Sequence, residues 1–123
     1  MHKVLVNRAV EILHTFPEID KLVLYGSVAR GDYRRDSDID IAVVCDDFWR
    51  CFPADLEGFP AGLRARIENA LKELQESSGI KCHVPLYWTS EFERGIELTS
   101  NRPGKDILNK VGILLYDSAP IVS

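Results

Sequence analysis

Apolar residues recur at three- and four-residue intervals in two stretches, the spacing that lines one face of an α-helix. The first stretch covers residues 4–16, and Pro17 predicts its end. The second covers residues 61–77, and Gly79 after it is a suitable C-terminal cap. The residues expected on the two buried faces are Val4, Leu5, Ala9, Val10, Ile12, Leu13 and Phe16 in the first helix, and Leu63, Ile67, Ala70, Leu71 and Leu74 in the second.

Four short apolar runs predict β-strands, at residues 21–25, 39–44, 80–88 and 112–117. Between the first two runs, Ser27 is a good N-cap for a brief helical turn that Gly31 and Asp32 would end. Residues 45–60 contain two prolines, a glycine and several aromatics, which predicts an irregular loop or a short helix packed over the sheet.

Two further helices are expected near the end of the chain. Thr89 or Ser90 can cap the first, with Glu91 and Glu93 in its first turn, and the second covers residues 105–110. Helices and strands therefore alternate along the chain, which predicts an α/β or α+β domain with helices packed on one small mixed sheet.

The composition limits the function. With 123 residues, 46% hydrophobic and 28% charged, the chain is expected to form one soluble domain, residues 1–123. A net charge of −4 argues against a protein that coats nucleic acid. Cys45, Cys51 and Cys82 lack metal-ligand spacing and fit free thiols in a reducing compartment. The first residues resemble neither a signal peptide nor a membrane span, so we expect a cytoplasmic protein.

An acidic pair opens the second predicted strand. Side chains alternate along a strand, so Asp38 and Asp40 would project to one face and Ile39 and Ile41 to the other. The two carboxylates would lie roughly 6–7 Å apart along the strand. Their repulsion is about 2–3 kcal/mol at an effective dielectric of about 20, and a divalent cation would compensate it.

The Gly26–Ser27 turn after the first strand fits the same purpose. Glycine allows close approach of a phosphate, and the amides that open the next helical turn would point at it. Mg²⁺ binds through one or two carboxylates and completes its shell with water and phosphates. The sequence therefore predicts a nucleotide held between metal and backbone.

Three other interpretations of these residues are weaker. Asp36, Asp38, Asp40 and Asp47 imitate EF-hand spacing, but Ile41 replaces the required glycine. The GSVARG segment is not followed by the Lys and Ser or Thr of a Walker loop. In the structural interpretation, the aspartates simply end a strand in solvent.

The segment GSVARGDYRRDSDIDIAVV resembles the signature of the DNA polymerase β-like nucleotidyltransferase superfamily, in particular its minimal nucleotidyltransferase (MNT) branch. The resemblance implies a mixed sheet flanked by helices and transfer of a nucleoside monophosphate with two Mg²⁺ ions. Gly26 and Ser27 would hold the β- and γ-phosphates of ATP, Asp38 and Asp40 would bind metal, and Arg30 would contact phosphate or pair with Asp38 or a neighbouring acid.

The chain departs from this pattern at one position. The resemblance implies a third carboxylate on the strand after the long helix, but residues 80–88 contain no acid. Strand alternation puts His83 closest to that place, either as a base or weak ligand or as a structural residue. Pro85 predicts an edge position or a bulge for this strand.

Other residues are weaker candidates for a functional site. Phe48, Trp49, Phe52 and Phe59 either cover the core or stack a base or a partner. His2 and His14 show no metal-site spacing, and Arg34 and Arg35 are expected to be solvated or to meet an acidic partner or the acceptor.

Two functions remain open. In the first, the protein is an enzyme that transfers AMP to a hydroxyl on a protein, as the resemblance to antitoxins encoded beside HEPN-domain toxins implies. In the second, the missing acid leaves a module that binds a nucleotide or neutralises its partner by contact. The sequence leaves homo-oligomerisation open.

Overall fold

The computed structural model describes residues 2–54, 58–94 and 112–118. The predicted helix at 105–110 lies outside these residues. The described elements are helix α1 (His2–Leu13), strand β1 (Ile19–Tyr25), helix α2 (Gly26–Arg30), strand β2 (Ile39–Cys45), a 3₁₀ helix (Asp47–Cys51), helix α3 (Leu63–Ser78), strands β3 (Cys82–His83) and β4 (Leu86–Trp88), helix α4 (Thr89–Arg94) and strand β5 (Ile113–Asp117).

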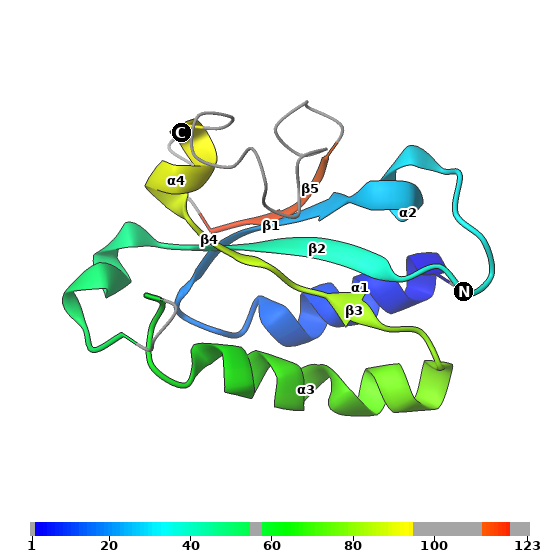
Figure 1. Ribbon diagram of the computed structural model, residues 1–123, viewed down its shortest axis with the longest axis horizontal. Coiled ribbons are helices and arrows are strands. Elements are labelled where there is room, and N and C mark those ends of the chain that lie inside the picture. Colours follow the sequence, from blue (N-terminus) through cyan, green and yellow to red (C-terminus); the bar gives the residue numbers. More distant parts are fainter. Residues whose placement is uncertain (1, 55–57, 95–111, 119–123) are drawn as a thin grey trace.

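The strands form one mixed sheet in the order β3-β2-β1-β5, with β4 also paired to β2 (Figure 1). β1 runs antiparallel to β2 and β5, whereas β3 and β4 run parallel to β2. The predicted mixed sheet is confirmed. The single strand expected over residues 80–88 is two short pieces at the edge of the sheet, with Pro85 between them, as the proline indicated.

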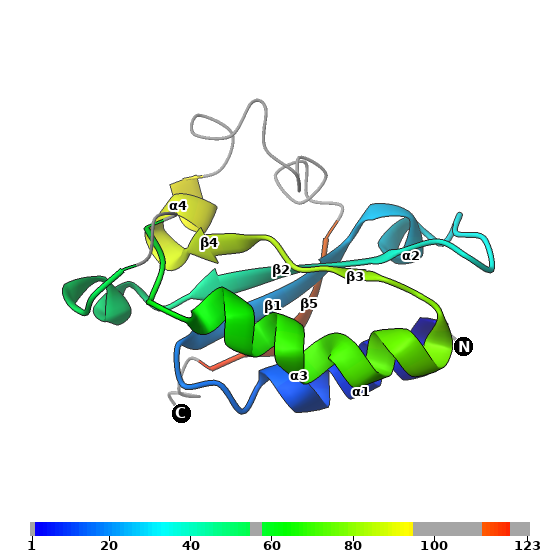
Figure 2. The same cartoon turned by 60° about the horizontal axis from the view of Figure 1, so that its bottom comes forward.

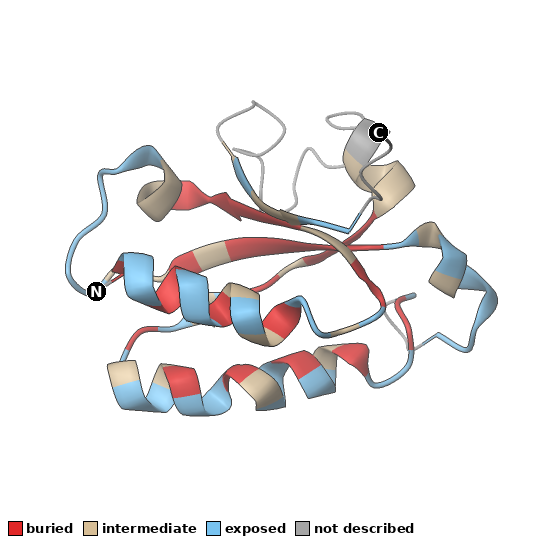
Figure 3. Ribbon diagram, turned by 180° about the vertical axis from the view of Figure 1, so that it is seen from behind, coloured by how far each residue is buried: buried red, intermediate tan, exposed pale blue. Residues whose placement is uncertain are grey.

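Helices cover both faces of the sheet. α1 and α3 lie on one face, and α4 lies on the other (Figures 1 and 2). The main core forms between the sheet and the α1–α3 layer, and β1 and β2 are buried along most of their length (Figure 3). A smaller cluster under α4 contains Val23, Tyr25, Ala42 and Tyr87, with Phe92 of α4 packed against it.

The expected buried face of α1 is partly wrong. Val4 is 59% exposed, whereas the buried stripe runs through Leu5, Val6, Ala9 and Leu13. Val4 is one residue before this stripe, and each residue turns the helix by about 100°, so its side chain points to solvent. The helix at residues 61–77 is confirmed as α3, with Gly79 as its left-handed C-cap.

The aromatic residues after β2 divide into two groups. Phe59 is buried and stacks on Trp88, and Trp49 packs partly against the core, as core cover predicts. Phe48 and Phe52 are exposed, so core cover is wrong for them, because the 3₁₀ helix extends beyond the sheet. Cys45, Cys51 and Cys82 are free thiols, and no described helix has the length and apolar character to cross a membrane.

Candidate active site

The acidic pair lies where β1, β2, β3 and α2 meet. Asp40 pairs with Tyr25 across the antiparallel β1–β2 ladder and with His83 across the parallel β2–β3 ladder. Gly26 follows Tyr25 directly. Two segments that are far apart in the sequence, the Gly-Ser turn and the strand after α3, are thereby brought to opposite sides of one carboxylate.

The predicted alternation of side chains is confirmed. Ile39 and Ile41 are fully buried in the core on the α1–α3 side. Asp38 and Asp40 are partly exposed, and Asp40 belongs to the face that also carries Ala42. The pair therefore lies on a solvent-accessible face, while the residue between its members anchors the strand.

Gly26 is required by its surroundings. Its φ is +76°, in the region that favours glycine, and a Cβ at this position would overlap the carboxylate of Asp40. The Gly-Ser turn and the acidic pair are thus in direct contact.

Ser27 does not cap α2. The helix begins at Gly26, one residue before the expected start, and its N-cap position is Tyr25, which makes no side-chain capping hydrogen bond. Ser27 is partly buried inside the first turn. The end of the helical turn at Gly31 is confirmed, because this residue is a left-handed C-cap.

His83 lies beside the acidic pair, as strand alternation predicted. Its Nε2 is 3.2 Å from Asp38 Oδ2, and the two side chains are 58% and 45% exposed. Among the described residues, no group of three or more His, Cys, Asp or Glu side chains is arranged to hold a metal ion. His83 thus brings an imidazole to the acidic pair, and residues 80–88 contain no carboxylate.

The loop before the acidic pair is held by a residue that sequence reasoning missed. His2 is buried, its Nε2 lies 2.9 Å from the carbonyl oxygen of Ser37, and its ring contacts Tyr33. Ser37 Oγ also accepts a hydrogen bond from the backbone N–H of Arg34. A lone histidine near the N-terminus gives no signal for this role, because the partner is 35 residues away.

Arg30 points to its own loop. Its Nε lies 3.4 Å from Asp32 Oδ2, and both side chains are exposed. The structure therefore shows the ion pair with a neighbouring acid that was one of the two alternatives. Arg34 and Arg35 are exposed, as expected for solvated charges.

Burial and the negative charges of Asp38 and Asp40 both affect the pKa of Cys82 on β3. Burial raises the pKa of the Cys82 thiol to about 11, and the charges of Asp38 and Asp40 contribute in the same direction. A cation or a cation-bound phosphate group would therefore find a favourable potential here.

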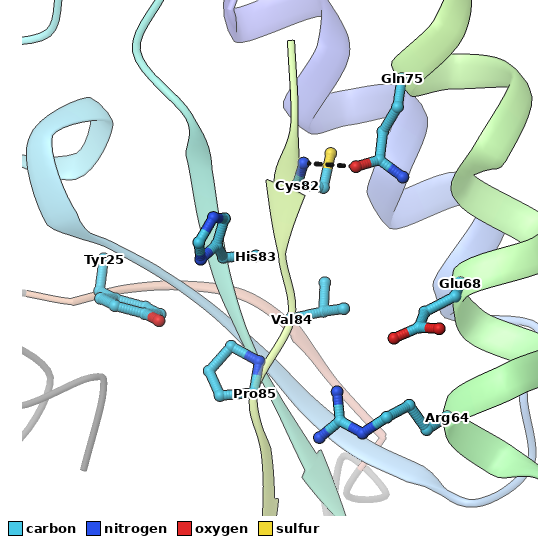
Figure 4. Close-up of a pocket in the computed structure, with 8 residues that line it drawn as sticks. All are labelled: Tyr25, Arg64, Glu68, Gln75, Cys82, His83, Val84 and Pro85. Carbon is cyan, nitrogen blue, oxygen red and sulfur yellow. Dashed lines mark hydrogen bonds between the residues drawn. The ribbon is translucent and has the colours of Figure 1, made fainter.

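A groove adjoins the acidic pair along the outer side of β3. It has a volume of about 590 Å³ (Figure 4). Tyr25, His83 and Pro85 line it on one side of the strand, and Arg64 and Glu68 of α3 line it on the other. The site is therefore open toward the sheet edge.

The donor set fits Mg²⁺. Two carboxylates on one face, with a glycine beside one of them, supply the one or two protein ligands that Mg²⁺ uses when water and substrate phosphates complete its shell. Asp38 and Asp40 are the residues that could hold it.

Comparison with known proteins agrees with this geometry. A family model described as polymerase beta, nucleotidyltransferase, matches residues 7–83. A Methanocaldococcus jannaschii protein, provisionally named protein adenylyltransferase, is 61% identical over 28 residues. This match covers 23% of the chain and only 28% of that relative's length.

Three solved structures share the fold. A provisionally assigned nucleotidyltransferase from Sulfolobus solfataricus has a TM-score of 0.50 and 19% identity, and the alignment covers 94% of this chain and 79% of that one. A toxin-antitoxin structure with AMP-PNP has a TM-score of 0.52 and 15% identity, covering 97% and 76%. A mutant of the toxin-antitoxin pair MntA-HpeT has a TM-score of 0.53 and 17% identity, and the alignment covers 93% of this chain and 73% of that one. At these identities the likeness shows the fold.

Proposed function

The chain belongs to the polymerase beta nucleotidyltransferase family, and from this premise we propose that it transfers AMP from ATP to a hydroxyl on a partner protein. The observation that carries this proposal is the contact between Gly26 and Asp40. It supports a single ligand that touches both the Gly-Ser turn and the acidic pair.

Each residue of the site has a role in this proposal. Asp38 and Asp40 hold Mg²⁺, with two ions as the family resemblance implies, and Gly26 and Ser27 receive the β- and γ-phosphates. Arg30 exchanges its exposed partner Asp32 for a phosphate oxygen. When bound, Mg²⁺ neutralises phosphate charge and lowers the pKa of the attacking hydroxyl.

The reaction forms one bond and breaks one. The acceptor oxygen bonds to the α-phosphorus, the bond from the α-phosphorus to the bridging oxygen breaks, and pyrophosphate leaves. His83, beside Asp38, is placed to take the hydroxyl proton. If it does, His83→Ala lowers the transfer rate by about 10²-fold or more, whereas an unchanged rate removes it from the mechanism.

The proposed acceptor belongs to a HEPN-domain toxin, for which this protein would be the antitoxin. Support comes from the shared fold with toxin-antitoxin structures. The neighbouring gene would identify the partner.

Transfer of label tests the function. The protein is incubated with Mg²⁺, α-labelled ATP and the protein encoded by the neighbouring gene. Asp38→Asn and Asp40→Asn should abolish labelling of the partner, whereas Asp36→Asn, an exposed acid in the same loop, should retain it. If neither the wild type nor the variants label the partner, the proposal that the protein is an enzyme is wrong.

A second function has its own support. The edge strand carries His83 where the family pattern implies a carboxylate. A module that binds a nucleotide or neutralises its partner by contact would form the complex without transferring label. Complex formation is therefore measured in the same samples by size-exclusion chromatography.

A further inference from the structure

The groove beside the acidic pair follows the side of β3 on which no strand pairs within the described residues. Residues 82–85 line it along the strand, and Arg64, Glu68 and Gln75 line it from α3. A groove between an edge strand and a helix is the geometry in which an extended peptide adds a strand to a sheet.

The hydrogen-bond pattern shows which backbone groups face this groove. Ile39 donates its N–H to the carbonyl of Lys81 and Val43 donates to that of Pro85, each at 2.9 Å. Residues 81 and 85 therefore face β2. Since the backbone groups alternate along a strand, those of Cys82 and Val84 face outward.

Pro85 does not block this outer edge. β3 and β4 pair with β2 in the same register, Ile39 with Cys82 and Val43 with Leu86. The N–H that proline lacks would have pointed inward, to β2. The proline thus interrupts the inner ladder and leaves the outward groups intact.

One outward group already binds an amide. The N–H of Cys82 donates to Gln75 Oε1 at 2.9 Å (Figure 4). A glutamine carboxamide has the same acceptor as a peptide bond. Gln75 therefore marks the position that the carbonyl of an added peptide would take.

A strand added here would lead to the acidic pair. It would lie about 4.8 Å outside β3 and about 10 Å from β2. Side chains directed to the face of Asp38 and Asp40 would extend past His83, which contacts Asp38. A hydroxyl at the end of a long side chain would then approach the acids.

We propose that the acceptor protein binds through an extended segment, which adds a strand outside β3 in this groove and displaces Gln75. The inference rests on the proposed function and specifies how its acceptor is held.

A tryptophan in the groove tests the binding mode. Glu68→Trp fills the groove from α3, and Asn69→Trp adds the same bulk beside Phe16 and Arg66, on another side of the helix. Glu68→Trp should raise KM for the partner protein by about tenfold or more through lost backbone hydrogen bonds. The affinity for Mg²⁺ and ATP, measured by calorimetry, should stay unchanged in both variants. Equal KM values for the two variants would show that the acceptor does not bind in the groove, and the proposed function would be unaffected. If the wild type transfers no label, both the proposed function and the binding mode are wrong.

A backbone scan of the acceptor gives a second measurement, independent of any folding defect. A synthetic peptide spanning the labelled hydroxyl, located by mass spectrometry, is methylated at one backbone nitrogen at a time. Strand addition predicts loss of labelling at every second position, by about tenfold, and tolerance between them. Tolerance throughout, or sensitivity every third or fourth residue, contradicts it. The proposal is also contradicted if the protein alone forms a dimer and Glu68→Trp dissociates it, because the groove would then bind a second copy of the chain.

Discussion

Carboxylates lie at both ends of the β1–β2 pair, and the two groups are held differently. At the end near α4, Asp20 accepts hydrogen bonds from Lys21 Nζ, Thr89 Oγ1 and Ser118 Oγ at 2.8–2.9 Å. Asp47 accepts from the N–H and hydroxyl of Ser90. These bonds connect β1, the 3₁₀ helix, α4 and the residue after β5, so the carboxylates at this end stabilise the fold.

At the other end, Asp38 has a different environment. Asp38 is nearly half exposed and contacts an imidazole. A carboxylate has about four acceptor positions, so it keeps capacity for a ligand. The donors around a carboxylate, more than its place at a strand end, therefore distinguish a structural acid from a candidate ligand.

The largest expected effect is at the contact between the turn and the acids. Gly26→Ala puts a Cβ into the carboxylate of Asp40, so transfer should fall by about 100-fold, as expected for a displacement near 1 Å at a reacting centre. Gly31→Ala is the matched control, because Gly31 also has a positive φ but has nothing within 4 Å of an added Cβ. It should lose stability and retain transfer. Equal losses of transfer would mean that backbone strain alone is responsible.

Stability should separate the two ends. Asp20→Asn should lower the free energy of unfolding by about 2 kcal/mol, because an amide cannot accept all three hydrogen bonds. Asp38→Asn should change it by less than about 0.5 kcal/mol, or raise it by relieving repulsion. Urea denaturation measures both. A loss at Asp38 as large as that at Asp20 would make Asp38 a structural residue.

The stability difference should depend on pH. Burial raises the pKa of Asp20, but hydrogen bonds from Lys21, Ser118 and Thr89 outweigh it and hold the pKa below the ordinary 3.8. A lowered pKa contributes stability that is present above the unfolded-state pKa and is lost as the pH falls through the folded-state pKa. The gap between wild type and Asp20→Asn should therefore close below pH 3.8 in urea titrations. A gap that is constant with pH would show that the hydrogen bonds do not favour the charged form.

The smallest effect reports on the acidic pair itself. Burial, and then the charges of Asp38 and Asp40, raise the pKa of Cys82 to about 11. Asp38→Asn should therefore increase iodoacetamide labelling of Cys82 by roughly twofold, relative to the exposed Cys51 in the same sample. Peptide mass spectrometry gives both rates. An unchanged labelling rate would show that burial alone, and not the charge of Asp38, slows the reaction of Cys82.

Most local elements could be predicted from the sequence. The strands at residues 21–25 and 39–44 follow from short apolar runs, and helix α3 follows from a period of 3.6; both patterns depend only on neighbouring residues. The common face of Asp38 and Asp40 follows from the same alternation. The errors at Val4 and Ser27 are shifts of about one residue, which change the face of a helix or the start of a cap.

The contacts within the site could be predicted less well from the sequence. The sequence predicted that the Gly-Ser turn and the acids would share a ligand, but their direct contact depends on the register of β1 with β2. The bonds from Gln75 to Cys82 and from His2 to Ser37 depend on where α3 and α1 pack. No local pattern encodes such distances.

The sequence by itself determined most of the elements, the mixed sheet and the motif of the nucleotidyltransferase family, because apolar runs, helical period and a motif are all local in the chain. Only the tertiary structure decided that His83 meets Asp38, that Asp20 is held by donors from distant segments, and that a groove follows the outer edge of β3. These features depend on strand register and helix packing, which the whole core determines.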